Sequence, residues 1–258
     1  MNNKLLELSM NNLADEDGDI LHIPHGDMPG DKINIEKSHI EKAKVIFPEL
    51  IKKVKECATT NSKVVITVCG GSGVGKSEIA SLLAHYFENM GVGCYTLSGD
   101  NYPHRIPVYN DAERLRIFRE SAIRGMITDG EYSFERFNII HQYQLENKDS
   151  EPKNIVKYPW YESYIRNGAM GLQGYLGTEK EINFFEIQNI VKEFKSGAEK
   201  IWLKRMGRED TELWYEEVDF SEKDILIIEW THGNSKNYTG VDIPVLLNST
   251  PKETLAHR

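Results

Sequence analysis

The feature that most constrains the fold is the stretch GGSGVGKS at residues 70–77. It directly follows the apolar run KVVITVC (63–69) and directly precedes EIASLLAHYF (78–87), where apolar residues recur at helical spacing. A strand, a glycine-rich loop and a helix in this order form one unit of a parallel sheet. The order therefore predicts an α/β fold with a doubly wound, mainly parallel sheet flanked by helices.

The glycine-rich stretch matches the spacing G-x-x-x-x-G-K-[ST] of a P-loop. In such a loop, backbone N–H groups and the start of the next helix surround a phosphate. We expect Lys76 to reach the β- and γ-phosphates of ATP and the Ser77 hydroxyl to ligate Mg²⁺. The alternative is a packing turn, which both flanking patterns disfavour. The expected nucleotide-binding residues are Gly70, Gly71, Ser72, Gly73, Val74, Gly75, Lys76, Ser77 and Glu78.

Composition excludes several function classes. The chain has 258 residues and a formal charge of -9, which argues against a general nucleic-acid binder. No apolar run approaches membrane-spanning length, and the acidic N-terminal stretch does not resemble a secretory signal. The three cysteines of the chain do not have the paired spacing of a metal site. These features favour a cytoplasmic protein that binds small molecules, and they leave a homo-oligomer open.

The pattern along the chain predicts a main domain over 38–258, with two less regular regions. Residues 1–37 are polar and form an N-terminal extension, in which ILHI (20–23) and KINI (32–35) suggest a hairpin. Residues 129–200 are aromatic-rich and indicate an inserted substrate- or lid-like region, with a glycine loop over 168–177 that is mobile or closely packed. Elsewhere we expect helices over 38–58, 111–126 and 184–194, a helix start at 250–253, and strands over 94–98, 201–205, 224–230 and 243–248.

Two carboxylates follow predicted strands. Asp100 comes just after the strand CYTLS, where it could accept a hydroxyl proton or hold the water shell of a metal, unless it is a turn residue. Glu229 closes the aliphatic strand DILIIEW, where a carboxylate is costly without a partner. That position favours a metal or a basic residue nearby, and a solvated strand end is the alternative.

Other side chains are weaker candidates for contacts with the acceptor or the transferred phosphate. Most exposed arginines are solvated, and an aromatic residue beside proline commonly packs its own loop. The four tryptophans are expected mainly in the core. The candidate substrate-binding residues are Asp100, Tyr102, Arg105, Lys204, Arg205 and Arg208.

GGSGVGKS followed by SGDNYP resembles the phosphoribulokinase and uridine kinase family of P-loop kinases, over residues 63–126 and 200–258. The GDN portion also resembles adenylylsulfate kinases. The resemblance implies that Asp100 acts as base and that Glu229 lies near Mg²⁺, so that Lys76, Asp100 and Glu229 form the catalytic set. The family's Tyr-Asp-Phe pattern is absent here, which puts the acceptor in doubt. The resemblance further implies an arginine-bearing lid that is not seen before Arg258, so we expect a truncated chain.

These observations predict a Mg²⁺-dependent kinase that moves the γ-phosphoryl group of ATP to a hydroxyl of a metabolite. A nucleoside-like acceptor is the first expectation and adenylylsulfate the second. A nucleotide switch is the alternative class, although the guanine-reading N-K-x-D is approached only by NKDS at 147–150. A third alternative is a nucleotide-stabilised scaffold whose 129–200 region binds a protein.

Overall fold

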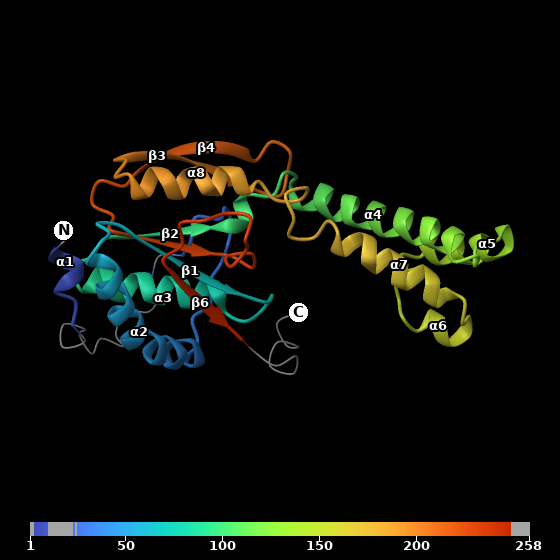
Figure 1. Cartoon of the computed structure of the whole chain (residues 1–258), viewed down its shortest axis with the longest axis horizontal. Helices are drawn as coiled ribbons and strands as arrows, with labels where there is room; N and C mark the ends of the chain where they lie inside the picture. Colours follow the sequence, from blue (N-terminus) through green and yellow to red (C-terminus); the bar gives the residue numbers. More distant parts are fainter. Residues whose placement is uncertain (1–2, 10–22, 24, 249–258) are drawn as a thin grey trace. The chain divides into compact units, whose positions relative to one another are not determined.

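The computed structural model describes residues 3–9, 23 and 25–248. The chain divides into two compact units (Figure 1), one formed by Met1–Tyr102 with Asn183–Arg258 and the other by Pro103–Ile182. The second unit begins and ends earlier than the insertion expected over 129–200. The difference arises because the helix before residue 129 packs within the second unit, whereas the helix after residue 183 belongs to the first.

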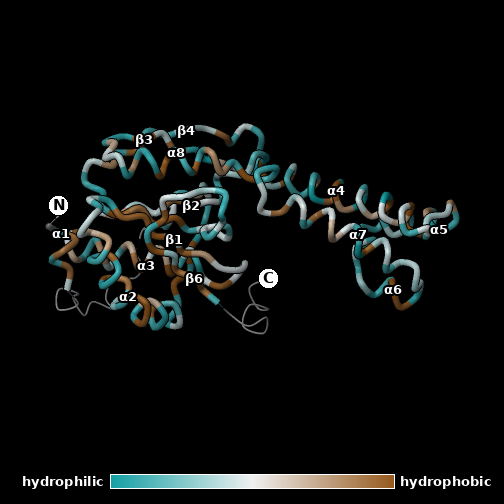
Figure 2. Tube along the Cα trace, viewed as in Figure 1, coloured by the Kyte–Doolittle hydropathy of each residue, from teal (hydrophilic) through white to brown (hydrophobic). Residues whose placement is uncertain are grey.

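The first unit contains a four-stranded parallel sheet in the order β2-β5-β1-β6. Its strands are β1 (Val64–Gly70), β2 (Cys94–Ser98), β5 (Ile225–Glu229) and β6 (Ile243–Leu247). β1 and β5 are buried along their whole length, as is usual where helices cover both faces of a sheet. Figure 2 shows the hydrophobic residues along these central strands. The predicted α/β fold with a parallel sheet is confirmed.

Helices cover this sheet on both sides (Figure 1). α2 (Lys37–Ala58) and α3 (Lys76–Asn89) pack together, with the Phe47 ring against Tyr86 and Phe87 at centroid distances of 5.1 and 4.9 Å. α8 (Phe184–Lys195) lies on the opposite side, and its Phe184 ring meets Trp230 at 5.4 Å. The short helix α1 (Asn3–Leu6) contacts α2, and a 3₁₀ turn, η3 (Gly99–Asn101), follows β2.

A separate antiparallel pair consists of β3 (Lys200–Met206) and β4 (Leu213–Asp219). The strand IWLKR is therefore confirmed, but it lies outside the parallel sheet. β4 was missed because LWYEEVD is largely exposed and shows no alternation between apolar and polar residues. The expectation of core tryptophans is wrong for this pair, since Trp202 and Trp214 are 60% and 40% exposed. Trp230 is buried as predicted.

The second unit is helical. It contains α4 (Pro107–Thr128), α5 (Phe134–Leu145), α6 (Asn154–Lys157) and α7 (Tyr161–Gln173), around a small core that includes Phe118, Tyr161 and Tyr164. Gly168 and Gly171 lie within α7, so the predicted glycine loop is wrong for these two positions. They are closely packed, because a Cβ at Gly168 would lie 2.6 Å from the Phe118 ring and one at Gly171 would lie 2.0 Å from Ser121 Oγ.

Several expectations fall at the edges of the described residues. KINI (32–35) does not form a strand, so the predicted hairpin strand is wrong there. Residues 20–22 of ILHI and the capping box at 250–253 lie outside the described residues. None of the helices in the described part of the chain combines the length and apolar character that a membrane crossing requires.

Candidate active site

The phosphate loop joins the end of β1 to the start of α3. Gly70 lies so close to β6 that a Cβ there would approach Leu247 O to 2.5 Å. Gly75 caps α3 with a φ of 87°, a conformation that favours glycine, and a Cβ would also meet the His39 ring at 2.9 Å. α3 begins at Lys76, directly after the loop, so the N–H groups of its first turn and the positive end of its dipole lie at the loop. This geometry is that of an anion-binding strand-loop-helix unit.

A lysine and a buried carboxylate meet beside the loop. Lys76 Nζ donates to Gly71 O at 3.3 Å and lies 4.0 Å from Glu229 Oε1. The Glu229 side chain is 8% exposed, and its pKa is raised to about 7 by burial and then by the negative charge of Asp100, while Lys76 opposes the rise. The basic partner that the strand position of Glu229 called for is therefore present.

Asp100 lies at the same edge of the sheet. Ser98, at the end of β2, pairs with Glu229 in β5, and Asp100 is the exposed residue two positions further on, in η3. Gly99 precedes it at very close approach to Trp230, where a Cβ would lie 2.0 Å from the indole. The carboxyl ends of β1, β2 and β5 thus bring Lys76, Asp100 and Glu229 together, while their individual roles remain predictions.

Two pockets adjoin the phosphate loop on the side of α2. A polar pocket of about 300 Å³ is lined by Asn34, Glu36, His39, Gly73, Gly75, Lys76, Ser77 and Glu78. A more apolar pocket of about 450 Å³ is lined by Ser38, Glu41, Lys42, Val45, Ile46, Val74, Leu246, Leu247 and Asn248. Both contain residues that precede β1, which sequence reasoning assigned to an extension and a packing helix.

His39 is the clearest of the missed residues. Its Nδ1 accepts a hydrogen bond from the Glu36 N–H at 3.1 Å, within a capping arrangement at the start of α2. That bond requires the Nδ1 lone pair, so a neutral His39 carries its proton on Nε2. A Cβ at Gly75 would lie 2.9 Å from this same Nε2. The only signal in the sequence was a histidine three residues after Glu36, which is not specific.

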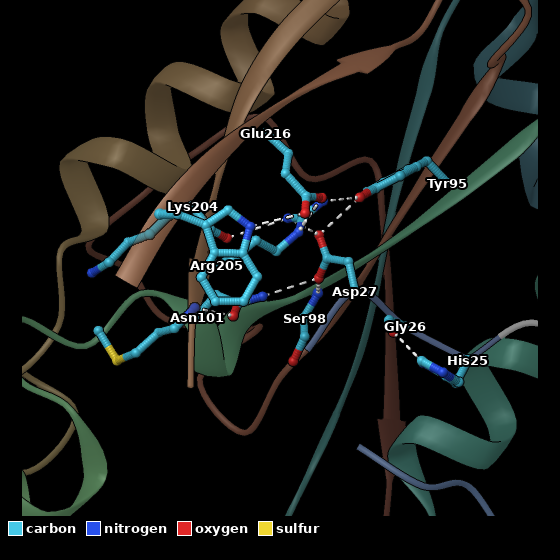
Figure 3. Close-up of polar contacts among 11 residues, drawn as sticks. His25, Gly26, Asp27, Tyr95, Ser98, Asn101, Lys204, Arg205 and Glu216 are labelled. Atoms are coloured by element: carbon cyan, nitrogen blue, oxygen red, sulfur yellow. Dashed lines mark hydrogen bonds and ion pairs between the residues drawn. The ribbon is translucent and has the colours of Figure 1, made fainter. Parts of the chain in front are cut away.

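A buried cluster behind the β2 edge contains Asp27 and Arg205 (Figure 3). The Arg205 side chain is 6% exposed, and its guanidinium donates to Asp27 Oδ2 at 2.8 Å, to Glu216 Oε2 at 3.0 Å and to Tyr95 Oη at 2.9 Å. Burial raises the pKa of Asp27, and the Arg205 guanidinium opposes that rise. These hydrogen bonds give Arg205 a structural role in the cluster, and a contact with a substrate stays a prediction.

The other predicted substrate contacts differ in their surroundings. Tyr102 is fully buried, and a substrate contact by it stays a prediction. Lys204 is buried on β3, and burial lowers its pKa. Arg208 is exposed after β3, with its backbone N–H donating to Glu212 at 2.8 Å. Arg105 belongs to the second unit, where it donates to Tyr175 Oη at 3.2 Å. Site roles for Lys204, Arg208 and Arg105 stay predictions.

Comparison with known proteins found similarity to a family model, a curated protein and a solved structure. Residues 48–124, which include the phosphate loop and Asp100, match the model of the Zeta toxin family. The chain is 39% identical over 211 residues to a bifunctional alpha-galactosidase/sucrose kinase from Mediterraneibacter gnavus. That alignment covers 81% of this chain but only 18% of the relative. A solved structure described as a fructose transport system kinase from Silicibacter sp. TM1040 is 13% identical, with a TM-score of 0.49, over 83% of this chain and 78% of that chain.

Proposed function

We propose that this protein is an ATP-dependent kinase that phosphorylates a hydroxyl of a small sugar. The observation that carries the proposal is the grouping of Lys76, Glu229 and Asp100 at the strand ends beside the phosphate loop. A nucleotide switch needs the loop, but it does not need a carboxylate placed to accept a proton from a second substrate.

The two pockets suggest how ATP is held. The phosphates would lie in the polar pocket, against the loop and the Lys76 ammonium. The adenine base would lie in the adjoining apolar pocket, between Val45 and Ile46 of α2, Val74 of the loop and Leu246 of β6. α2 thus forms one wall of the nucleotide site in this proposal.

Residues suited to Mg²⁺ are present in the same place. No group of three or more His, Cys, Asp or Glu side chains suited to a metal occurs within the described part of the chain. Mg²⁺ commonly uses one or two protein oxygens together with waters and phosphates, so the Ser77 hydroxyl and the Glu229 carboxylate fit it. Bound Mg²⁺ would neutralise charge that develops on the phosphates. It would also favour ionised Glu229 over the protonated form that burial promotes.

In the proposed reaction an acceptor hydroxyl attacks the γ-phosphorus of ATP. A new O–P bond forms, the bond between the γ-phosphorus and the bridging oxygen breaks, and ADP leaves. The hydroxyl proton passes to the Asp100 carboxylate. Lys76 stabilises the charge on the transferred group, because an ammonium is a point charge suited to phosphate oxygens.

The nature of the acceptor rests on the relative. The relative at 39% identity is named a sucrose kinase, which favours sucrose as the first acceptor. The nucleoside acceptor expected from the uridine kinase resemblance ranks lower, because that family's Tyr-Asp-Phe pattern is missing. Adenylylsulfate ranks below it.

The test is an assay of ADP formation with Mg-ATP and each of sucrose, fructose, glucose, uridine and adenylylsulfate, with product identification by mass spectrometry. We expect sucrose to stimulate ADP formation and to yield a sugar phosphate. Lys76→Ala serves as the inactive control, and Lys53→Ala, which alters an exposed lysine of α2, as the matched control. Nucleotide binding with slow hydrolysis and no stimulation by any acceptor would favour the switch alternative instead.

A further inference from the structure

We propose that Asp27, in the segment that precedes α2, is a positioning residue that holds the turn carrying Asp100. This inference rests on the proposed role of Asp100 as the base. In this proposal the position of the base depends on a residue outside the region that carries the sequence motifs. Asp27 lies 71 positions before Ser98 in the chain.

One carboxylate oxygen of Asp27 contacts both ends of the turn. Asp27 Oδ1 accepts the Ser98 backbone N–H at 2.7 Å and the Asn101 side-chain amide at 3.1 Å. Ser98 and Asn101 stand on either side of Gly99 and Asp100 in the chain. Figure 3 shows Asp27 pointing toward both residues. The turn is therefore fixed at its first and last residues by a single acceptor.

The other oxygen anchors the carboxylate itself. Asp27 Oδ2 accepts from Arg205 at 2.8 Å and from the Tyr95 hydroxyl at 3.0 Å. Asn101 is also tied to β3, since its Oδ1 accepts the Met206 N–H at 3.0 Å. Because hydrogen bonds to charged groups are among the stronger ones, this arrangement defines the turn closely.

The division between the two oxygens separates positioning from simple stability. A carboxylate that served only to neutralise buried Arg205 would need Oδ2 alone. The Trp230 indole lies directly against Gly99. The turn is therefore confined by this indole at Gly99 and by Asp27 at both of its ends. A base displaced by about 1 Å loses much of its effect, since proton transfer needs hydrogen-bond contact with the acceptor hydroxyl.

The decisive variant is Asp27→Asn. The single amide oxygen should turn toward the positive Arg205, which leaves the NH₂ group facing two donors, the Ser98 N–H and the Asn101 amide. The variant therefore removes the contacts to the turn and keeps the contact to Arg205. Tyr95→Phe is the matched control, because it removes one hydrogen bond to Oδ2 and none to Oδ1.

Hydrogen exchange of the backbone amides provides a readout without an acceptor. We expect the Ser98 amide to exchange at least tenfold faster in Asp27→Asn and to remain close to wild type in Tyr95→Phe. Equal exchange in the two variants would overturn the claim that Asp27 holds the turn, whether or not the protein is a sucrose kinase.

Turnover with sucrose then tests the link to Asp100. We expect Asp27→Asn to lower kcat at least tenfold, to leave the Kd for ATP unchanged, and to have no further effect in an Asp100→Asn background. Additive losses in the double variant would show that Asp27 does not act through Asp100. A third outcome is faster exchange of the Ser98 amide in Asp27→Asn together with no acceptor-dependent turnover in the wild type. In that case the proposed function fails, while the structural assignment of Asp27 stands.

Discussion

Lys76 Nζ lies 4.0 Å from Glu229 Oε1, and this is the closest approach between the phosphate loop's lysine and the carboxylate that ends β5. The pair lies where β1 and β5 run side by side, with Val68 opposite Glu229. Despite this cation the pKa of Glu229 is raised to about 7, because burial outweighs the attraction of Lys76.

The raised pKa of Glu229 predicts a specific pH dependence of stability. The folded state holds a proton that the unfolded state, with a pKa near 4.5, has already released. The contribution of Glu229 to the free energy of unfolding is therefore fully present below pH 4.5. It falls as the pH rises toward 7, by roughly 3 kcal/mol at most. Denaturant unfolding at several pH values should show this decline in the wild type, and Glu229→Gln should lessen it. An identical slope in the variant would show that Glu229 is ionised well below pH 7.

Lys76→Ala should abolish the stabilisation by Mg-ATP in a thermal-shift assay. A ligand that binds only the folded state raises Tm by mass action, and Lys76 provides the point charge toward the phosphates. The unliganded fold should survive. A shift equal to that of the wild type would rule out a phosphate contact by Lys76.

Asp100→Asn should lower acceptor-dependent turnover by about 10²–10⁴ while nucleotide affinity is retained. Asparagine keeps the size of the side chain but cannot take the hydroxyl proton. The measurement is kcat with sucrose beside the Kd for ATP. Loss of both would assign Asp100 a metal-related or structural role, and loss of neither would make it a turn residue.

Gly99→Ala should destabilise the first unit by about 1–3 kcal/mol and reduce turnover, because the new methyl group would overlap the Trp230 indole. Chemical denaturation measures the cost. In a Gly99→Ala background, Trp230→Leu should cost less than it does in the wild type, since the smaller side chain makes room. Strictly additive costs would contradict the close approach.

Gly171→Ala should loosen the α4–α7 pair, although alanine normally favours a helix. Its Cβ would lie 2.0 Å from Ser121 Oγ, whereas a Cβ at Gly174 meets nothing closer than 3.4 Å. Hydrogen exchange in α4 and α7 should therefore accelerate in Gly171→Ala and not in the matched Gly174→Ala. Equal protection in both variants would mean that the helices can move apart at little cost.

The strand-loop-helix unit could be predicted because its signals are local. GGSGVGKS, the β-branched run before it and the periodic run after it all lie within 25 residues, and each supports the others. Asp100 and Glu229 could be placed at one sheet edge because parallel strands share the direction of their carboxyl ends. No long-range contact was needed for either step.

The role of the N-terminal segment could not be predicted, because it depends on contacts distant in sequence. Asp27 and Arg205 are 178 positions apart, and neither carries a local pattern. Arg205 therefore looked like a solvent-facing residue that could meet a substrate, while it serves a buried cluster. The loop predicted at Gly168 and Gly171 was wrong for a related reason, since glycine occurs at close helix crossings as well as in loops.

The backbone hydrogen bond between Asn183 and Tyr102 bears on how the second unit can be inserted into the first. The Asn183 N–H donates to Tyr102 O at 2.9 Å, so the first unit is continuous across the point where the chain leaves it. The second unit is closed in the same way by the Pro103–Ile182 bridge and the bond from the His104 N–H to Glu181 O at 2.9 Å. Residues 103–182 thus form a cassette with adjoining ends, whose gain, loss or exchange carries little chain-closure entropy and leaves the strand order unchanged.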